Sequence, residues 1–244
     1  MISARRGIGQ RTGTWIVQDM IFRDRRDAGQ RLAQALEKYR GQDVIVLGIP
    51  RGGVMTGYPI AEALNGELDV IIVRKLPLPF NPEAGFGAVT DDGSLILNDR
   101  IVRAVGLTAE QIDAIAQRVL AEVRRRVQVY RGDHPPPQLT DRTIILVDDG
   151  LATGYTMIAA IESVKKKAPR QVVVAVPCSP ASTVERVRPL ADDFVWLVAP
   201  ETESFAVASF YEDFHEMSDE EVTSLLARFR TRGQLSSSPH HWRE

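Results

Sequence analysis

This chain of 244 residues has only one cysteine, and it lacks an excess of basic residues and long apolar runs. The single cysteine, Cys178, excludes a framework of intrachain disulfides and is typical of a reducing compartment. A formal net charge of −2 at pH 7 gives no overall basic surface, so general binding to nucleic acid is not indicated. No apolar run approaches the length of a transmembrane helix, which argues against a membrane partner.

The composition of the chain and of its two ends predicts where the protein is located and how far its folded domain extends. Arg5, Arg6 and Arg11 are not followed by the hydrophobic segment of a signal peptide, and with the lone cysteine this predicts a cytoplasmic protein. With 44% hydrophobic residues the chain can bury a full α/β core. We expect one domain over residues 21–232, an N-terminal arm over 1–20 and a C-terminal tail over 233–244, with the arm and tail disordered.

The stretch over residues 143–156 is the most informative in the sequence. Residues 143–147 (TIILV) are typical of a parallel strand buried on both faces, and Asp148 and Asp149 follow where open α/β sheets bind ligands. A small-residue turn then leads into a helix from Thr153, whose N-terminus attracts anions. A sugar phosphate suits both features, because the N–H groups bind phosphate and the carboxylates accept hydrogen bonds from ribose hydroxyls. A structural turn without a ligand is the alternative.

A second strand, loop and helix precede this stretch. Residues 43–49 (DVIVLGI) predict a strand, and Pro50-Arg51-Gly52-Gly53 leads from it into a helix over residues 54–64. The two glycines allow the backbone to approach a ligand and present N–H groups to an anion, and Arg51 adds a forked positive charge. Taken alone, this loop is equally typical of an ordinary strand-to-helix turn.

Residues 145–156 (ILVDDGLATGYT) resemble the phosphoribosyl-pyrophosphate (PRPP) motif of type I phosphoribosyltransferases. The resemblance implies that Asp148 and Asp149 hold the ribose 2′- and 3′-hydroxyls. It also implies a loop that wraps the 5′-phosphate, formed by Gly150, Leu151, Ala152, Thr153, Gly154 and Thr156. Gly150 departs from the family, which usually has an aliphatic residue or Ser there; we expect the glycine to loosen the loop without a clash.

The resemblance extends to the earlier loop, because Arg51-Gly52-Gly53 is similar to the pyrophosphate loop of the family. That loop often has a cis peptide before its basic residue, which here is the Pro50–Arg51 bond. A further strand over residues 69–73 ends at Arg74-Lys75. In the family a basic residue at this place often contacts pyrophosphate, so Lys75 is a candidate and Arg74 a weaker one. A solvated pair is the alternative.

Residues 76–87 (LPLPFNPEAGFG) show neither helical nor strand periodicity, and a loop of this length is usually functional or disordered. The family has a mobile loop here that closes over the reaction centre and excludes water. Glu83 in this loop is a candidate general acid or base, with an exposed surface residue as the alternative. Residues 88–97 predict a β-hairpin with an Asp-Gly turn.

The remaining segments complete an α/β pattern. Residues 108–130 predict a long amphipathic helix on which Arg124-Arg125-Arg126 forms a solvated face or an oligomer contact, and residues 171–177 and 194–198 predict two further strands. The aromatic residues between 205 and 214 either stack an acceptor base or close the core. We therefore expect a doubly wound parallel sheet flanked by helices, with a flexible loop and hairpin and a small C-terminal hood.

The function implied by the resemblance is Mg²⁺-dependent transfer of the phosphoribosyl group from PRPP to a nitrogenous base, with release of pyrophosphate. Arg51, Lys75 and Glu83 would be the catalytic residues, and Asp148 and Asp149 would support Mg²⁺ indirectly, through water or the ribose hydroxyls. A homodimer is usual for such proteins. The alternative is a sensor of PRPP or nucleotides without catalysis.

The acceptor base is less well defined by the resemblance. Family members that act on 6-oxopurines commonly have an Asp at the position of Ala152, so this chain is more similar to the adenine type.

Overall fold

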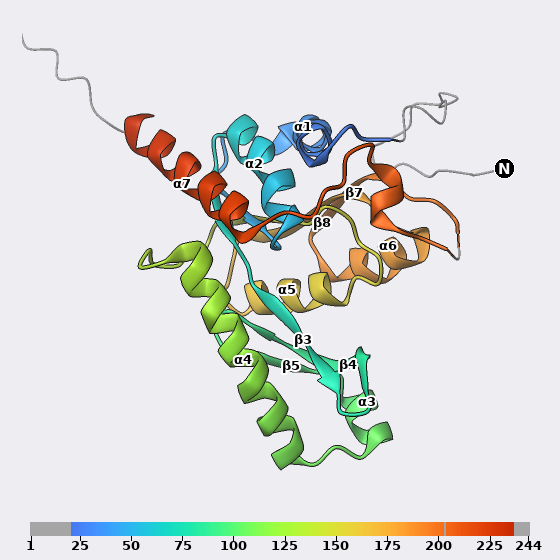
Figure 1. Ribbon diagram of the computed structural model, residues 1–244. Helices are drawn as coiled ribbons and strands as arrows, with labels where there is room; N and C mark the ends of the chain where they lie inside the picture. The colour runs from blue at the N-terminus through green and yellow to red at the C-terminus, as the bar shows by residue number, and fades with distance from the viewer. Residues whose placement is uncertain (1–20, 203, 237–244) are drawn as a thin grey trace, which may run out of the picture.

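A five-stranded parallel sheet forms the centre of the computed structural model, which describes residues 21–202 and 204–236 (Figure 1). Its strand order is β2-β1-β6-β7-β8. The strands are β1 (Val44–Gly48), β2 (Glu67–Val70), β6 (Thr143–Val147), β7 (Gln171–Cys178) and β8 (Asp193–Val198). Every residue of β1 and β6 is buried, which explains why both read as uninterrupted apolar runs.

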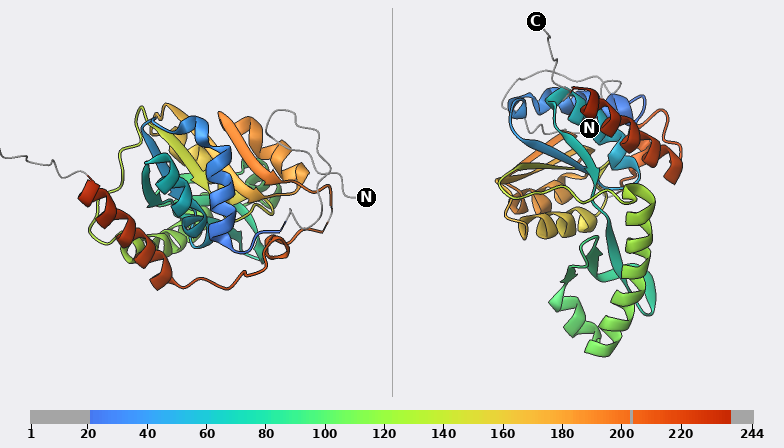
Figure 2. Two further views of the ribbon diagram at one scale, coloured as in Figure 1. Left: turned by 90° about the horizontal axis from the view of Figure 1, so that it is seen from above. Right: turned by 90° about the vertical axis from the view of Figure 1, so that its left-hand side faces the viewer.

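Helices cover both faces of this sheet, which confirms the doubly wound fold (Figures 1 and 2). Val44 and Val46 of β1 pack in one core cluster with α1, α2 and α7, whereas Ile45 and Leu47 pack in another with α5 and α6. The helices are α1 (Arg25–Ala35), α2 (Gly52–Leu64), α5 (Tyr155–Lys165), α6 (Ala181–Val187) and α7 (Asp219–Ser236), with short 3-10 turns η2 (Glu37–Tyr39) and η3 (Arg188–Leu190). Neighbouring residues of β1 face different helices because side chains along a strand point alternately to the two faces of the sheet.

A separate antiparallel sheet corrects the expected loop over residues 76–87. Its order is β3-β4-β5, formed by β3 (Val73–Leu78), β4 (Asn81–Thr90) and β5 (Leu95–Leu97). The proline-rich segment therefore lies in a hairpin whose register shifts around Pro77. Pro77 is tolerated because β3 is an edge strand, where a missing N–H need not break the sheet. The predicted strand over residues 69–73 is also divided, since β2 ends at Val70 and β3 begins at Val73.

The small sheet and two helices form an arm that extends from the main body (Figure 2). The helix α3 (Asp99–Val105) was not predicted from the sequence, although Asn98 caps it and Gly106 ends it. The helix α4 (Ala109–Arg131) has the expected capping box between Thr108 and Gln111. It packs along β3 and against α7, so it connects the arm to the body.

The C-terminal segment crosses the carboxyl ends of the strands and includes the 3-10 helix η4 (Val207–Phe210). A bridge between Phe22 and Tyr211 joins it to the segment before α1, and these rings form a small core with Cys178. The helix α7 continues to Ser236, so the predicted boundary at 233 falls inside it; residues 1–20 lie outside the described part. Over residues 21–202 and 204–236, no helix is long and apolar enough to cross a membrane.

Candidate functional site

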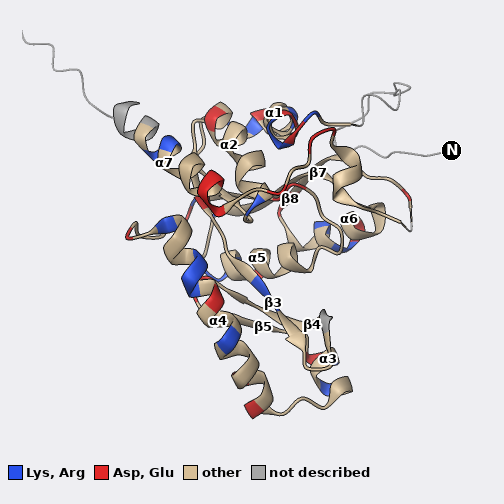
Figure 3. Cartoon of the chain, viewed as in Figure 1, with Lys and Arg blue, Asp and Glu red and all other residues tan. Residues whose placement is uncertain are grey.

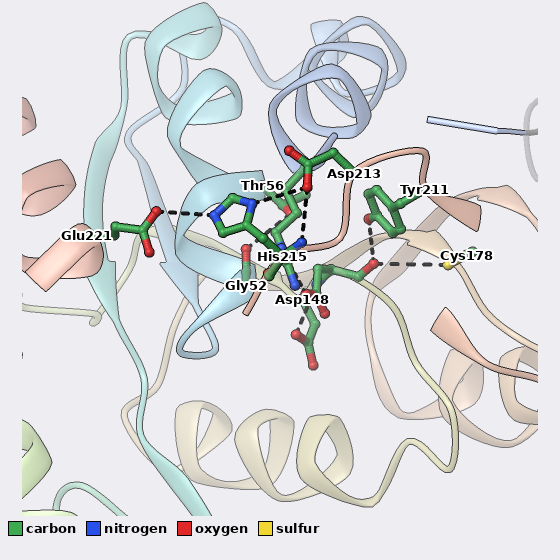
Figure 4. Close-up of polar contacts among 10 residues, drawn as sticks. Gly52, Thr56, Asp148, Cys178, Tyr211, Asp213, His215 and Glu221 are labelled. Carbon is green, nitrogen blue, oxygen red and sulfur yellow. Dashed lines mark hydrogen bonds and ion pairs between the residues drawn. The ribbon is translucent and has the colours of Figure 1, made fainter. Parts of the chain in front are cut away.

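The two predicted loops meet because their strands are neighbours. Gly48 of β1 is paired with Val147 of β6, so the loops that follow both strands leave the sheet at the same edge. Residues 50–52 of one loop, Asp148, Asp149 and Thr156 of the other, and the segment from Phe214 to Met217 line one cavity of about 580 Å³. Figure 4 labels Gly52, Asp148 and His215, one residue from each of these three segments. The cavity lies at the carboxyl ends of parallel strands, as expected for a ligand site in this fold.

The acidic turn places its two carboxylates in different environments. The N–H of Asp149 donates to Asp148 Oδ1 at 2.9 Å, and Asp149 Oδ2 lies 2.7 Å from Arg25 Nε. Burial, followed by the negative charge of Asp149, raises the pKa of Asp148 well above its ordinary value. Both residues line the cavity, and each of these bonds uses one carboxylate oxygen. Two carboxylates therefore line the cavity. Among the described residues, the carboxylate of Asp149 forms an ion pair and that of Asp148 does not.

Arg25 is a site residue that the sequence interpretation missed. Its side chain is 8% exposed; besides Asp149, it donates through Nη1 to the carbonyl oxygen of His215, and its guanidinium lies 3.9 Å from the centre of the Phe214 ring. The sequence contained a signal, because Arg25 lies three positions before Ala28 and so on the apolar stripe of α1. A charged residue on such a stripe needs a buried partner.

The Gly-Gly loop approaches the acidic turn very closely. The Pro50–Arg51 peptide bond is cis, as predicted. A Cβ atom on Gly52 would lie 1.9 Å from Asp149 Oδ2 and 2.8 Å from Arg25 Nε, so only glycine fits this position. Arg51 lines the cavity, and its Nη2 lies 2.5 Å from Glu216 Oε1. The loop thus brings a positive charge to the wall of the cavity.

The turn after the acidic pair is held by neighbouring segments. Its Leu151 N–H donates to the Cys178 carbonyl, Thr183 donates to the Ala152 carbonyl, and Arg186 donates to the Thr153 carbonyl. Gly150 is buried and fits without a clash, as expected, whereas a Cβ atom there would lie 2.6 Å from Val207 Cγ1. Gly154 caps α5 with φ of 73°, and Thr156 lines the cavity.

Of the predicted basic pair, Arg74 lines the cavity and Lys75 does not. Adjacent residues of a strand point to opposite faces, and the Lys75 side chain is exposed and lies along Gly85. Arg126 of α4 also lines the cavity, which corrects its interpretation as part of a solvated or oligomer face. Glu83 lies in β4, and its side chain is outside the described part; Lys75 and Glu83 therefore stay predictions.

The C-terminal segment closes the cavity from above. His215 lies between two carboxylates, with Nδ1 3.3 Å from Asp213 and Nε2 3.2 Å from Glu221 (Figure 4). These two carboxylates raise the pKa of His215. Phe214 lines the cavity, whereas Phe205, Phe210 and Tyr211 close the small core. Cys178 is buried there, and burial raises the pKa of its thiol, which favours a role as a small core side chain over one as a nucleophile.

Comparison with known proteins agrees with this geometry. The model of the family described as "Phosphoribosyl transferase domain" matches residues 18–209. The chain belongs to the phosphoribosyltransferase family. The matched range contains every element of the central sheet, both loops and the arm, so the family assignment covers the whole cavity except its C-terminal lining.

Individual relatives support membership of the phosphoribosyltransferase family. Two proteins of Mycobacterium tuberculosis, provisionally named phosphoribosyl transferases, are each 43% identical over 208 residues, which is 85% of this chain and 47% of theirs. The chain therefore spans about half the length of these curated relatives. The crystal structure of TT1426 from Thermus thermophilus is 41% identical, covers 86% of this chain and 99% of its own, and has a TM-score of 0.77.

Proposed function

We propose that the chain transfers the 5-phosphoribosyl group from PRPP to a nitrogenous base and releases pyrophosphate. The observation that carries this proposal is the convergence of the acidic turn and the Gly-Gly loop on one cavity. Carboxylates suit ribose hydroxyls, whereas glycine N–H groups and arginine suit phosphates. A site that has both, at the ends of adjacent strands, matches a pentose with phosphates on each side.

Each part of the cavity has a role in this proposal. Asp148 and Asp149 accept hydrogen bonds from the 2′- and 3′-hydroxyls and fix the sugar. The loop from Gly150 to Thr156 and the first turn of α5 bind the 5′-phosphate, since Gly154 leaves that turn without a side-chain cap. Arg51 and the amide of Gly52 stabilise the negative charge that grows on departing pyrophosphate, by about 2–4 kcal/mol for each well-aimed donor. The Gly53 N–H donates instead to the Ile49 carbonyl, so Gly53 serves to let the loop turn tightly.

The residues present fit Mg²⁺ as a partner of the substrate. No cluster of three or more His, Cys, Asp or Glu side chains that would enclose a metal occurs in the described part of the chain. The hard oxygen donors that the cavity offers to a cation are Asp148 and Asp149, since the Glu216 carboxylate pairs with Arg51, and this suits a cation that takes its other ligands from phosphates and water. Bound Mg²⁺ would neutralise charge on the pyrophosphate group. The nucleophile is the nitrogen of the acceptor, so no protein nucleophile is needed.

Asp148→Asn tests the ribose assignment, because this change removes a carboxylate charge without breaking the pair between Arg25 and Asp149. We expect calorimetry with PRPP and Mg²⁺ to show a loss of affinity of at least tenfold, since hydrogen bonds to charged groups contribute about 1.5–3 kcal/mol. Asp133→Asn, an exposed change outside the cavity, is the control. An Asp148→Asn variant that binds PRPP as tightly as the wild type contradicts the assignment.

Release of pyrophosphate from PRPP tests catalysis directly. The wild-type chain is incubated with PRPP, Mg²⁺ and a panel of purine, pyrimidine and other nitrogenous bases, and pyrophosphate is measured. We expect release with at least one base, and Ala152 leads us to include adenine first. If PRPP binds but no base supports turnover, the chain is a sensor rather than a transferase.

A further inference from the structure

The helix α6 packs directly against the turn that follows the acidic pair. A Cβ atom on Gly154 would lie 2.8 Å from Val187 Cγ2 and 2.9 Å from Thr183 Cγ2, so glycine is needed for this close contact. Among the seven residues of α6, Thr183 is a buried polar residue and Arg186 is the only basic one (Figure 3). These two residues are three positions apart, so they lie on the same side of the helix.

Both of these side chains bind carbonyl oxygens of the turn. The Thr183 hydroxyl donates to the Ala152 carbonyl oxygen at 2.8 Å, and Arg186 Nη2 donates to the Thr153 carbonyl oxygen at 2.9 Å. Arg186 Nη2 also donates to Thr183 Oγ1 at 3.1 Å, which leaves the hydroxyl hydrogen of Thr183 for Ala152. The two side chains thus form one hydrogen-bonded unit that holds two successive carbonyl groups.

The direction of these carbonyl groups fixes the direction of the next two N–H groups. In a trans peptide the C=O and N–H bonds point in opposite directions, and Pro50–Arg51 is the only cis bond among the described residues. The N–H groups of Thr153 and Gly154 therefore point away from α6. Within residues 21–202 and 204–236, neither N–H group has a hydrogen-bond acceptor in the protein. Successive N–H groups of this kind are available to an anion.

The opposite orientation of either peptide would be unfavourable for a bound phosphate. If the peptide rotated, a carbonyl oxygen would replace the N–H group, and its partial negative charge would repel the phosphate oxygens. Ala152 and Thr153 are exposed, so packing of their side chains does little to prevent this rotation. The donors from α6 oppose it, because each carbonyl group would lose its hydrogen bond.

We propose that Thr183 and Arg186 are positioning residues for the 5′-phosphate of PRPP. They hold the carbonyl groups of the turn toward α6, so that the N–H groups of Thr153 and Gly154 meet the phosphate. Neither Thr183 nor Arg186 lines the cavity, so both act through the backbone of the turn. The inference rests on the proposed function and adds to it two residues that set the affinity for the sugar phosphate without contacting it.

Two variants at Thr183 separate positioning of the turn from packing of the helix. Thr183→Val removes the hydroxyl group at about the same volume, whereas Thr183→Ser keeps the hydroxyl group. PRPP, ribose 5-phosphate and inorganic pyrophosphate are titrated by calorimetry, each with Mg²⁺, into the full chain and both variants. We expect Thr183→Val to bind PRPP and ribose 5-phosphate about 3- to 10-fold more weakly, as for loss of one hydrogen bond, and pyrophosphate to change less than about twofold. Thr183→Ser should bind all three ligands as the wild type does.

Arg186→Met tests the second contact at an exposed side chain. We expect the same selective loss, about 3- to 10-fold for PRPP and ribose 5-phosphate. Because the two side chains act as one unit, the double variant with Thr183→Val should lose less affinity than the product of the two single losses. Arg188→Met is the control: Arg188 is exposed and lies 6.0 Å from the centre of the Trp196 ring, so none of the three affinities should change.

The pattern across the three ligands decides the outcome. Unchanged affinity for ribose 5-phosphate in Thr183→Val and Arg186→Met, or equal weakening of all three ligands, overturns the inference, as does a Thr183→Ser variant that binds like Thr183→Val. If Thr183→Val does not fold, the exposed Arg186→Met decides the question alone. A wild-type chain that binds neither PRPP nor ribose 5-phosphate contradicts the proposed function itself. A wild-type chain that binds both, with variants that show no selective loss, contradicts only this inference.

Discussion

Arg25 Nε lies 2.7 Å from Asp149 Oδ2, although the two residues are 124 positions apart in the sequence. Their side chains are 8% and 16% exposed, so the pair is largely removed from water. Arg25 also binds the His215 carbonyl and stacks on Phe214. One side chain therefore joins α1, the acidic turn and the segment that closes the cavity, and it fixes the second carboxylate of the pair.

Loss of this ion pair should affect both folding and binding. In Arg25→Met the Asp149 carboxylate stays buried without its partner, and we expect the free energy of unfolding to fall by about 3 kcal/mol. PRPP affinity should fall as well, because the carboxylate is no longer oriented. Denaturant titration and calorimetry measure the two effects. Arg23→Met is the control: that side chain is 73% exposed and pairs with Asp27 at 3.6 Å, so a change within about 0.5 kcal/mol is expected. A stable Arg25→Met variant with full affinity would show that the pair is dispensable.

The close approach at Gly52 predicts a sensitive position. A methyl group in Gly52→Ala would overlap Asp149 Oδ2, so the loop or the carboxylate must move, and we expect PRPP affinity to fall at least tenfold. Calorimetry gives the affinity and thermal unfolding gives the stability. In Gly41→Ala there is space for the methyl group, but φ of 81° strains it, so that variant should lose about 1 kcal/mol of stability with unchanged affinity. Parallel losses of affinity in both variants would mean that stability alone is responsible.

Glu216 competes with the pyrophosphate group for Arg51. Its carboxylate lies 2.5 Å from Arg51 but is 84% exposed, so the pair is weak and readily displaced. We expect Glu216→Gln to raise PRPP affinity by up to about fivefold, as for loss of an exposed pair of up to about 1 kcal/mol. Glu212→Gln, an exposed change in the same segment, should leave the affinity unaltered. A decrease in Glu216→Gln would instead assign Glu216 to ligand or metal binding.

The raised pKa of His215 predicts that the free energy of unfolding depends on pH. Hydrogen bonds to Glu221 and Asp213 raise its pKa in the folded state above the unfolded value, so its contribution to stability is complete below the unfolded pKa of 6.5. The contribution is lost as pH rises through the folded pKa. Urea titrations should show that His215→Asn differs more from the wild type at pH 5.5 than at pH 8.5. The exposed His134→Asn should show no such trend. A difference that grows with pH would contradict this assignment.

Several features of the site could be predicted from residues that are close together in the sequence. The strand, acidic turn and helix at Asp148 and Asp149, and the loop at Gly52, formed as expected because each is decided by residues close in sequence. Apolar strands long enough to be buried on both faces must lie inside a sheet, and loops after neighbouring parallel strands must share an edge. The cis Pro50–Arg51 bond was predicted from the family resemblance and is confirmed.

The sequence determined the kind of site, but tertiary structure decided which side chains complete it. Residues 76–87 form the end of the hairpin between β3 and β4, and the pairing of these two strands across a register shift is not revealed by any local pattern. Arg74 rather than Lys75 lines the cavity, and Arg126 alone of three consecutive arginines turns inward, because the placement of β3 and α4 fixes which face is covered. Arg25 and Glu216 reach the loops from distant segments. Periodicity gives the face of an element, but only packing determines what that face meets.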